Sequence, residues 1–352
     1  MQVGIQFFPD IGPDVKSARD YWQEALSLVA LCDRYGYSHV RTVEHYFHPY
    51  GGYSPNPVVF LAAAAQVTKR ARLVTGAVLP AFNNPLKLAG ELAMLDALCN
   101  GRLDIGFARA FLPHEFSRFG VRLDESRARF DEGMEQVRLL LEQENVTCEG
   151  RFQSFANVTS LPRPTQKPRP PFYVAALATK ESFERAGAAG HGIMAIPMAG
   201  GAMADLINTY REAWQRAGHR GRGTVMLAFH MFCHEDQARA EQIAREPLNR
   251  YLRSLVAAAS DWMAGESSVD YPGYDKIIAA LSRDTFETQV EKCAAWIGTP
   301  QRILDTVGTY RRQIGDFEIA SLQVNFHDIA LADAQASMRL FGEDVLPRLP
   351  KL

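Results

Sequence analysis

The sequence alternates between short apolar runs and amphipathic helical patterns, and this alternation recurs along all 352 residues. Such alternation is typical of consecutive βα units and a parallel sheet. The predicted strands are residues 3–8, 39–43, 72–78, 103–107, 172–175, 193–196, 225–232 and 320–325. Helical patterns begin near Ser17, Pro57, Pro85, Ser126, Thr179, Ala202 and Pro300. Because eight βα units close a barrel, the sequence predicts an α/β fold of the TIM (β/α)8 class.

Three stretches are longer than a minimal barrel requires. They are residues 111–125, a hairpin-like stretch at 146–155 followed by a proline-rich stretch at 161–171, and residues 261–289. Since 47% of the residues are hydrophobic, the chain suffices for one large core. We predict a single domain, residues 1–352, with insertions at the carboxyl-end loops. Residues 261–289 are rich in glycine, serine and acidic side chains, which suits a mobile lid and equally a solvated connector.

Charge and motifs exclude several classes of function. The net charge is −2 and basic residues never form a run, so we expect neither a nucleic-acid nor a membrane partner. No two histidines stand two residues apart, no CxxC pair occurs and the five cysteines are scattered, so we expect no metal and no disulfide framework. The sequence has no Walker loop, no GxSxG elbow and no GxGxxG fingerprint after a strand. We expect a cytoplasmic protein with a small-molecule ligand, since no stretch approaches the length of a membrane span.

Polar side chains follow the predicted strands at the carboxyl end of the barrel, where TIM barrels place their active sites. Glu44 and His45 follow the second strand and bring an acid and an imidazole to this edge. Arg109 follows the fourth strand, and Arg127 lies in the first turn of the next predicted helix.

Further candidates lie at the same edge of the predicted barrel. Gly76 and Ala77 come from the third strand, and Thr179 and Ser182 come from the helix after the fifth strand. Two arginines, hydroxyl groups and a helix N-terminus together favour an oxyanion. The sequence therefore predicts a site for a phosphate monoester.

Seven short segments match, in order, one known family. They are TVEHYF (42–47), TGAVLP (75–80), GRLDIGFAR (101–109), FSRFG (116–120), PFYVAA (171–176), GTPQ (298–301) and SMRLF (337–341). With these segments the chain resembles the bacterial luciferase family of flavin-dependent monooxygenases over essentially its whole length. The resemblance implies a TIM barrel that binds reduced FMN (FMNH2) or, in a sister branch, the deazaflavin F420.

The resemblance also implies roles for individual residues. His45 matches the family's acid/base beside the reacting flavin edge, and Glu44 is expected to orient it. Gly76 and Ala77 match the site of a non-proline cis peptide behind the isoalloxazine. Arg109 and Arg127 match phosphate-binding arginines.

Two departures from the family pattern lie close to these positions. Residues 178–182 match the family's phosphate loop, but Leu177 and Ala178 stand where the family has a glutamate and a serine. We therefore expect the hydrogen bonds from this loop to the phosphate to come from the backbone at Ala178, from Thr179 or from Ser182. Ala108 replaces the family's reactive cysteine, so light emission is not expected.

The implied activity is that of a monooxygenase. In such an enzyme, reduced FMN from a separate reductase reacts with O2 to form a C4a-peroxyflavin. We expect this to occur in a dry pocket lined by Phe7, Phe8 and Phe111. The product is an oxidised aldehyde, a Baeyer–Villiger ester or a hydroxylated compound. Alternatives are F420-dependent hydride transfer and a non-catalytic partner subunit. We also expect a homodimer through the helices near residues 57–69 and 85–98, which carry apolar side chains on more than one face.

Overall fold

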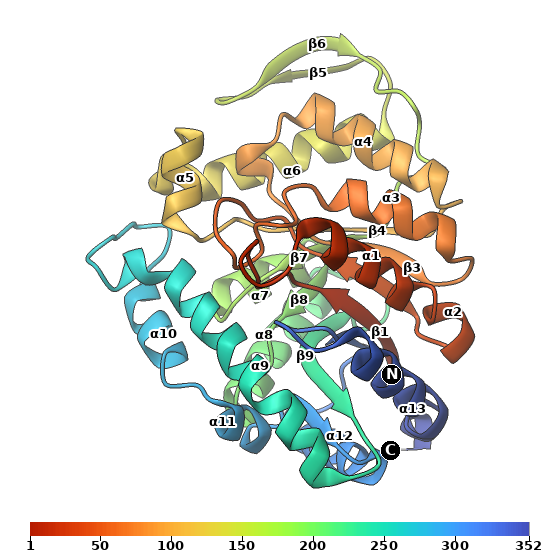
Figure 1. Ribbon diagram of the computed structural model, residues 1–352. Coiled ribbons are helices and arrows are strands. Elements are labelled where there is room, and N and C mark those ends of the chain that lie inside the picture. The colour runs from red at the N-terminus through yellow and green to blue at the C-terminus, as the bar shows by residue number, and fades with distance from the viewer. Residues whose placement is uncertain (352) are drawn as a thin grey trace.

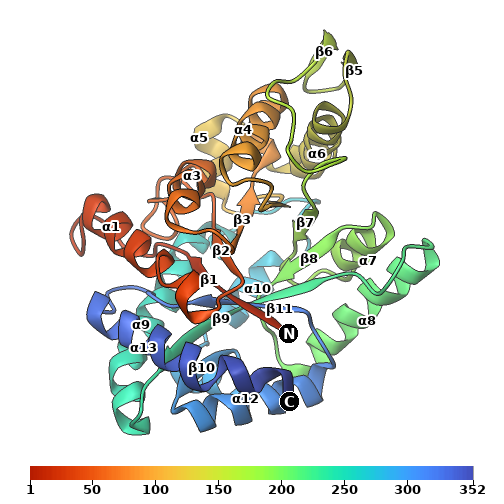
Figure 2. The same ribbon diagram turned by 90° about the vertical axis from the view of Figure 1, so that its right-hand side faces the viewer.

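The computed structural model describes residues 1–351 of the chain. Eight parallel strands close into a barrel, with β1 hydrogen-bonded to β2 and β11, and β9 joined to both β8 and β11. The strands lie at the centre of the molecule with helices around them (Figure 2). They are β1 (Gln2–Phe7), β2 (His39–Thr42), β3 (Arg72–Val78), β4 (Leu103–Phe107), β7 (Phe172–Ala175), β8 (Gly192–Ala195), β9 (Val225–Cys233) and β11 (Ile319–Gln323). The TIM barrel predicted from the sequence is confirmed.

Helices cover the outside of this barrel (Figure 1). They are α1 (Ala18–Val29), α2 (Cys32–Tyr35), α3 (Pro57–Val67), α4 (Pro85–Leu98), α6 (Ser126–Glu142), α7 (Lys180–Ala188), α8 (Gly200–Arg216), α9 (Gln237–Ala258), α12 (Pro300–Ile314) and α13 (Leu331–Asp344). Several begin where the sequence predicts, because their first turns are capped by local chemistry: Ser17 accepts from the Asp20 amide, and Asn84 accepts from the Leu86 amide. A short 3-10 turn, η4 (Leu346–Lys351), follows α13.

Side chains alternate between the inside and the outside of the barrel along each strand. On β1, Gln6 and the following Phe8 face the cavity inside, whereas Phe7 packs outward on Phe60 of α3, with ring centroids 5.3 Å apart. Phe7 is fully buried in the core between strands and helices. The prediction that Phe7 lines the substrate pocket is therefore wrong, because its neighbours Gln6 and Phe8 take the inward positions.

A ninth parallel strand, β10 (Ala295–Gly298), is absent from the predicted set. It pairs with the last four residues of β9, beyond the part of β9 that β8 covers. Trp296 on this strand is fully buried and stacks on Phe229 with centroids 4.3 Å apart. Four residues directly after a helix give too short a pattern to separate a strand from a loop.

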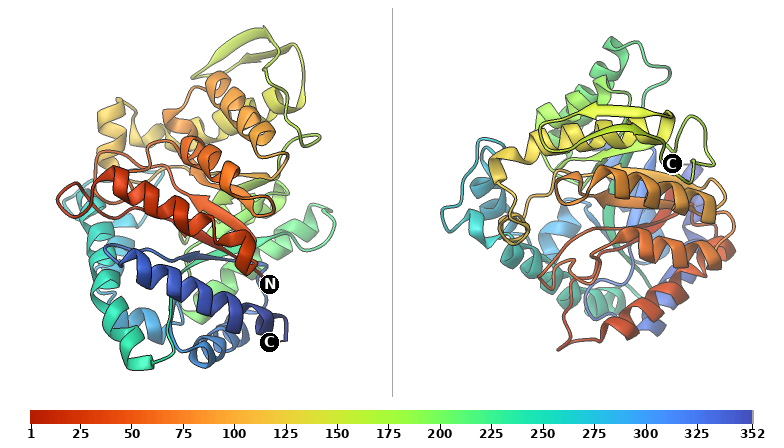
Figure 3. Two further views of the ribbon diagram at one scale, coloured as in Figure 1. Left: turned by 45° about the vertical axis from the view of Figure 1, so that its right-hand side comes forward. Right: turned by 90° about the horizontal axis from the view of Figure 1, so that it is seen from above.

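The insertions lie in two places. The mouth of the barrel carries η1 (Pro80–Phe82), α5 (Pro113–Phe119), η2 (Leu123–Glu125), η3 (Ser260–Trp262), α10 (Tyr274–Leu281) and α11 (Phe286–Glu291). The predicted hairpin is present as β5 (Val146–Glu149) and β6 (Ser154–Val158). It follows α6 rather than a strand, and it lies outside the barrel beside α4 and α6 (Figure 3).

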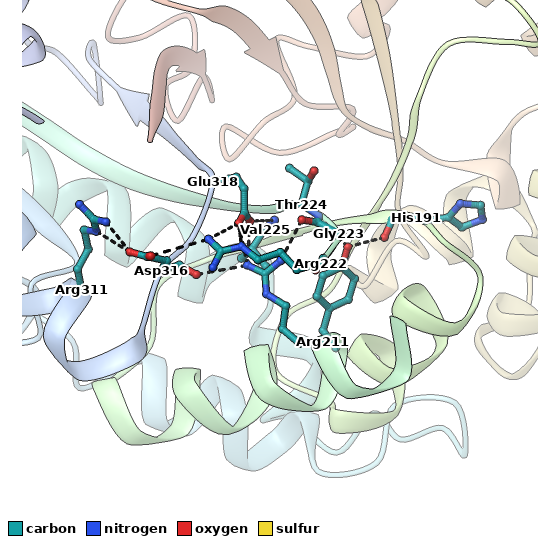
Figure 4. Close-up of polar contacts among 10 residues, drawn as sticks. His191, Arg211, Arg222, Gly223, Thr224, Val225, Arg311, Asp316 and Glu318 are labelled. Carbon is teal, nitrogen blue, oxygen red and sulfur yellow. Dashed lines mark hydrogen bonds and ion pairs between the residues drawn. The ribbon is translucent and has the colours of Figure 1, made fainter. Parts of the chain in front are cut away.

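An ion-pair network closes the opposite end of the barrel, before β9 and β11 (Figure 4). Glu318 accepts hydrogen bonds from Arg211, Arg222 and the Val225 amide at 2.8 to 2.9 Å. Arg311 forms an ion pair with Asp316, which lies on the same loop as Glu318. These contacts fix the starts of two strands far from the mouth, so we assign them to stability. Among the described residues no helix has the length and hydropathy needed to cross a membrane.

Candidate active site

One cavity of about 340 Å³ opens at the carboxyl end of the barrel. Strands β1, β2, β3, β7, β8 and β9 and the loop after β4 contribute lining residues, and the mouth insertions cover part of the cavity. Most predicted site residues converge here. Those that line the cavity are Glu44, His45, Gly76, Ala77, Arg109, Arg127, Thr179, Ser182, Phe8 and Phe111. Ala178 lies between two lining residues, Leu177 and Thr179, without lining the cavity itself.

His45 is held by a carboxylate that the sequence analysis missed. Its Nδ1 lies 3.0 Å from Oε1 of Glu115, which also accepts from the Tyr46 amide at 2.8 Å. Glu115 comes from α5 and is fully buried. Gly51, with φ of 83°, packs against the His45 ring where a Cβ would collide with it. The Nδ1 contact leaves the second ring nitrogen of His45 for the cavity.

Glu44 does not orient His45, contrary to the expectation. Its carboxylate accepts from the Tyr46 hydroxyl at 2.6 Å, the Asn83 amide at 2.8 Å and the Leu79 backbone N–H at 3.1 Å. Glu44 and His45 both lie beyond the end of β2 and both line the cavity, but their side chains have different hydrogen-bond partners. Burial raises the pKa of Glu44 to about 7. Glu44 therefore ties the ends of β2 and β3 together beside the cavity.

The Gly76–Ala77 peptide bond is cis, as the resemblance implies, and both residues line the cavity. Arg41 of β2 runs beneath it and donates to the Gly76 carbonyl at 3.0 Å. A Cβ on Gly76 would occupy the position of the Arg41 Nε atom. Glycine is therefore required here by the close approach of Arg41.

The predicted phosphate residues gather on the other side of the cavity. Arg109 donates to the Asp270 carbonyl at 2.7 Å, and its guanidinium lies 4.4 Å from the centre of the Tyr271 ring. Arg127 pairs with Glu181 at 3.2 Å.

Helix α7 begins at this place with no side chain capping its first turn, although Thr179 and Ser182 hydroxyls lie 2.7 Å apart. Free N–H groups of a helix N-terminus, two hydroxyls and two arginines fit a phosphate group.

Aromatic side chains form the wall around His45. Phe8 lies 5.3 Å and Phe111 lies 6.0 Å from the His45 ring, and Tyr50 lies 4.3 Å from Phe8. From the mouth insertion, Trp262 donates to the Phe111 carbonyl at 2.8 Å. The result is a largely apolar pocket with a few polar groups, as small-molecule sites have.

Residues that the sequence analysis missed have a common feature. Arg41 and His230 line the cavity from the middle of a strand, and Glu115 contacts His45 from an insertion helix, whereas the prediction considered strand ends and helix starts. Arg41 carried a visible signal, since an arginine between Val40 and Thr42 interrupts an otherwise buried strand. Among residues 1–351, no group of three or more potential metal ligands lies together.

Comparison with known proteins identifies the class. A family model described as luciferase-like monooxygenase matches residues 1–316. The chain is 30% identical over 305 residues to the oxygenase component of flavin-dependent trigonelline monooxygenase from Acinetobacter baylyi, covering 84% of this chain and 82% of that one. The chain therefore belongs to the luciferase-like monooxygenase family, which confirms the resemblance seen in the sequence.

Two solved structures extend the comparison. Monooxygenase RslO1 from Streptomyces bottropensis matches with a TM-score of 0.89 and 43% identity, over 99% of this chain and 100% of that chain. The oxygenating constituent of 3,6-diketocamphane monooxygenase from the CAM plasmid of Pseudomonas putida, in complex with FMN, matches with a TM-score of 0.82. Its 20% identity, over 99% of this chain and 98% of that one, shows a shared fold.

Proposed function

We propose that the protein is the oxygenase of a two-component system, which binds FMNH2 and transfers an oxygen atom from O2 to a small organic substrate. The observation that carries this proposal is the arrangement of the cavity. His45, held by the buried Glu115, faces the cavity on one side, and Arg109, Arg127 and the uncapped start of α7 form an anion site on the other. Reduced FMN, when bound, supplies the electrons that activate O2.

Residues of this chain are assigned to cofactor binding, to proton transfer and to the exclusion of water. Arg109, Arg127, Thr179 and Ser182 are assigned to the phosphate, and Gly76–Ala77 to one face of the flavin ring. His45 is assigned to hold or release a proton at its free ring nitrogen, with Glu115 fixing the orientation of the imidazole. Phe8 and Phe111 exclude water from the reacting atoms.

The proposal names an external reductase as the source of FMNH2. The relative from Acinetobacter baylyi is itself described as an oxygenase component, which supports a separate reducing partner. The sequence also contains no dinucleotide fingerprint after a strand. The substrate class includes aldehydes, ketones and compounds with an electron-rich centre, as the family resemblance implies.

A second part of the proposal is a homodimer through α3 and α4. Large apolar side chains on these helices are exposed: Val59, Val67, Leu86, Met94 and Leu98. Val59 is 69% and Met94 56% exposed, which is unusual for a helix whose other face already packs on the barrel. A second copy of this chain covers such a patch in an isologous interface.

The phosphate subsite gives the test of cofactor choice. Wild-type protein should bind FMNH2 far more tightly than reduced riboflavin, which has the same ring and no phosphate. Arg109→Met should weaken FMNH2 binding at least tenfold and leave riboflavin binding nearly unchanged, since one charge-assisted phosphate contact is worth roughly 1.5 to 3 kcal/mol. Arg216→Met, an exposed arginine on α8, is the control. Equal binding of the two flavins by wild-type protein would refute the phosphate assignment.

A further inference from the structure

A second cationic group lies deep in the cavity, apart from the phosphate arginines. Arg41 of β2 lines the cavity floor together with Gln6 of β1 and His230 of β9. We call these three residues the polar floor. Arg41 lies on β2, whereas the start of α7 in the phosphate subsite follows β7. Strands β3 and β4 lie between β2 and β7, so one phosphate group does not reach both Arg41 and the start of α7.

The Arg41 guanidinium has neutral partners only. Nη1 donates to Oε1 of Gln6 at 2.6 Å and Nη2 to the Gly76 carbonyl at 3.0 Å, while the buried Nε has no partner. Arg41 takes part in none of the ion pairs found among residues 1–351. Burial lowers its pKa to about 10, so it remains charged at neutral pH.

The surrounding titratable groups do not neutralise this charge. Of the nearest phenols, Tyr50 is buried and Tyr251 is partly buried, and removal from water raises the pKa of both. Burial lowers the pKa of His230 to about 3, so it is neutral, and its Nε2 has no partner. An unpaired buried cation is costly unless a bound anion offsets it.

The floor also limits the kind of anion. Gln6 and the Gly76 carbonyl each take one N–H of the guanidinium, and its other N–H groups, the Nε–H included, are left for a ligand. Aromatic rings surround the floor: Tyr251 lies 4.5 Å from His230, and Phe8 lies 4.3 Å from Tyr50. A flat conjugated ligand with a delocalised negative charge fits these surroundings.

From these contacts we infer that the polar floor binds a planar, conjugated organic anion and that Arg41 neutralises its charge. Two sources supply this chemistry: a phenolate or enolate form of the organic substrate, and the reduced flavin ring itself. The inference rests on the proposed function only if the bound anion is the reduced flavin ring. It makes Arg41 a determinant of which ionisation state the bound ligand adopts.

The test uses 4-nitrophenol, whose anion absorbs visible light, with flavin-free protein. The bound probe should ionise at lower pH than in solution, because wild-type protein binds the phenolate at least about tenfold more tightly than the phenol, equivalent to one pKa unit. Arg41→Met should abolish this shift, and Arg41→Gln is a second uncharged variant if the first fails to fold. Arg41→Lys keeps the charge and should keep most of the shift, and the surface variant Arg216→Met should behave as wild type.

Two further measurements separate the sources. If FMN-loaded protein still binds 4-nitrophenolate in an Arg41-dependent way, the anion is the substrate. If FMN displaces the probe and the midpoint potential of bound FMN falls in Arg41→Met, the anion is the reduced flavin. Identical probe ionisation and identical FMN potential in wild type and both uncharged variants would overturn the inference. Failure of wild-type protein to bind FMNH2 would refute the proposed function, while the flavin-free titration would still decide the role of the floor.

Discussion

At the scale of one residue, the local sequence predicts the position of His45 but not its hydrogen-bond partner. Its place after an apolar strand predicts a cavity position, and it lines the cavity. Its partner Glu115 lies 70 positions away on an insertion helix. The neighbouring acid in the sequence, Glu44, also lines the cavity but accepts hydrogen bonds from Tyr46, Asn83 and Leu79 instead. Contacts between distant segments depend on tertiary packing, which no local motif specifies.

The first prediction concerns the His45–Glu115 pair. Replacement His45→Ala should reduce turnover about 100-fold or more, the usual contribution of a positioned acid/base, while FMNH2 affinity stays nearly unchanged. Glu115→Gln should reduce turnover about tenfold, and the double variant should be no slower than His45→Ala alone, because Glu115 acts through His45. Steady-state kinetics of the three variants test this. Additive losses, or loss of flavin binding in parallel with rate, would assign the pair to folding.

The second prediction concerns Glu44. Its folded-state pKa, about 7, lies above the ordinary value of 4.5, so between these values the folded protein keeps a proton that the unfolded chain has lost. The free energy of unfolding of wild type, relative to Glu44→Gln, should therefore fall by about 3 kcal/mol as pH rises from 4.5 to 7 and stay level above 7. Urea unfolding at several pH values measures it. A constant difference across this range would show that Glu44 has no raised pKa.

At the scale of elements, the segment of residues 261–289 covers the mouth of the barrel. Its Tyr271 hydroxyl donates to the carbonyls of Arg109 and Ala110 at 2.9 and 2.8 Å, and Asp270 accepts from the Arg127 amide at 2.9 Å. The segment thus contacts both proposed phosphate arginines. The sequence predicted its position, but its composition left a lid and a connector equally open, because these backbone contacts depend on the folded mouth.

The third prediction is that this segment acts as a lid coupled to the phosphate subsite. Proteolysis should cut wild-type protein within residues 261–289, and FMNH2 added under anaerobic conditions should protect it. Trp262→Ala removes the hydrogen bond to Phe111 and should speed cutting several-fold. Cleavage that FMNH2 does not slow, or cleavage confined to the β5–β6 hairpin, would identify the segment as a plain connector.

The fourth prediction concerns the exposed face of α3 and α4. If this face forms the homodimer, Val59→Lys with Met94→Lys should convert the protein to monomers, because charges there meet each other across an isologous contact. Val269→Lys is the matched control, since Val269 is 85% exposed and lies on the mouth segment. Light scattering of the three proteins measures the outcome. A monomeric wild type, or a dimer unaffected by the double change, would contradict the interface.

At the scale of the whole molecule, the eight-strand barrel follows from hydrophobic patterning, since all eight predicted strands are present with ends shifted by few residues. Strand β10 was missed because its register depends on β9 extending past β8. The site divides in the same way. Residues at strand ends and helix starts were predictable, whereas Arg41 and His230 lie inside strands, and only the closed barrel brings them to one cavity.

The proposed function requires that this cavity binds FMNH2 for reaction with O2. Anaerobic titration of wild-type protein with FMNH2 and with reduced F420, followed by exposure to O2, tests it most directly. We expect saturable binding of FMNH2 at one site per chain, weakened by Arg109→Met and unaffected by Arg216→Met, and no comparable binding of reduced F420. Binding of reduced F420 in preference to FMNH2, or binding of neither, would contradict it.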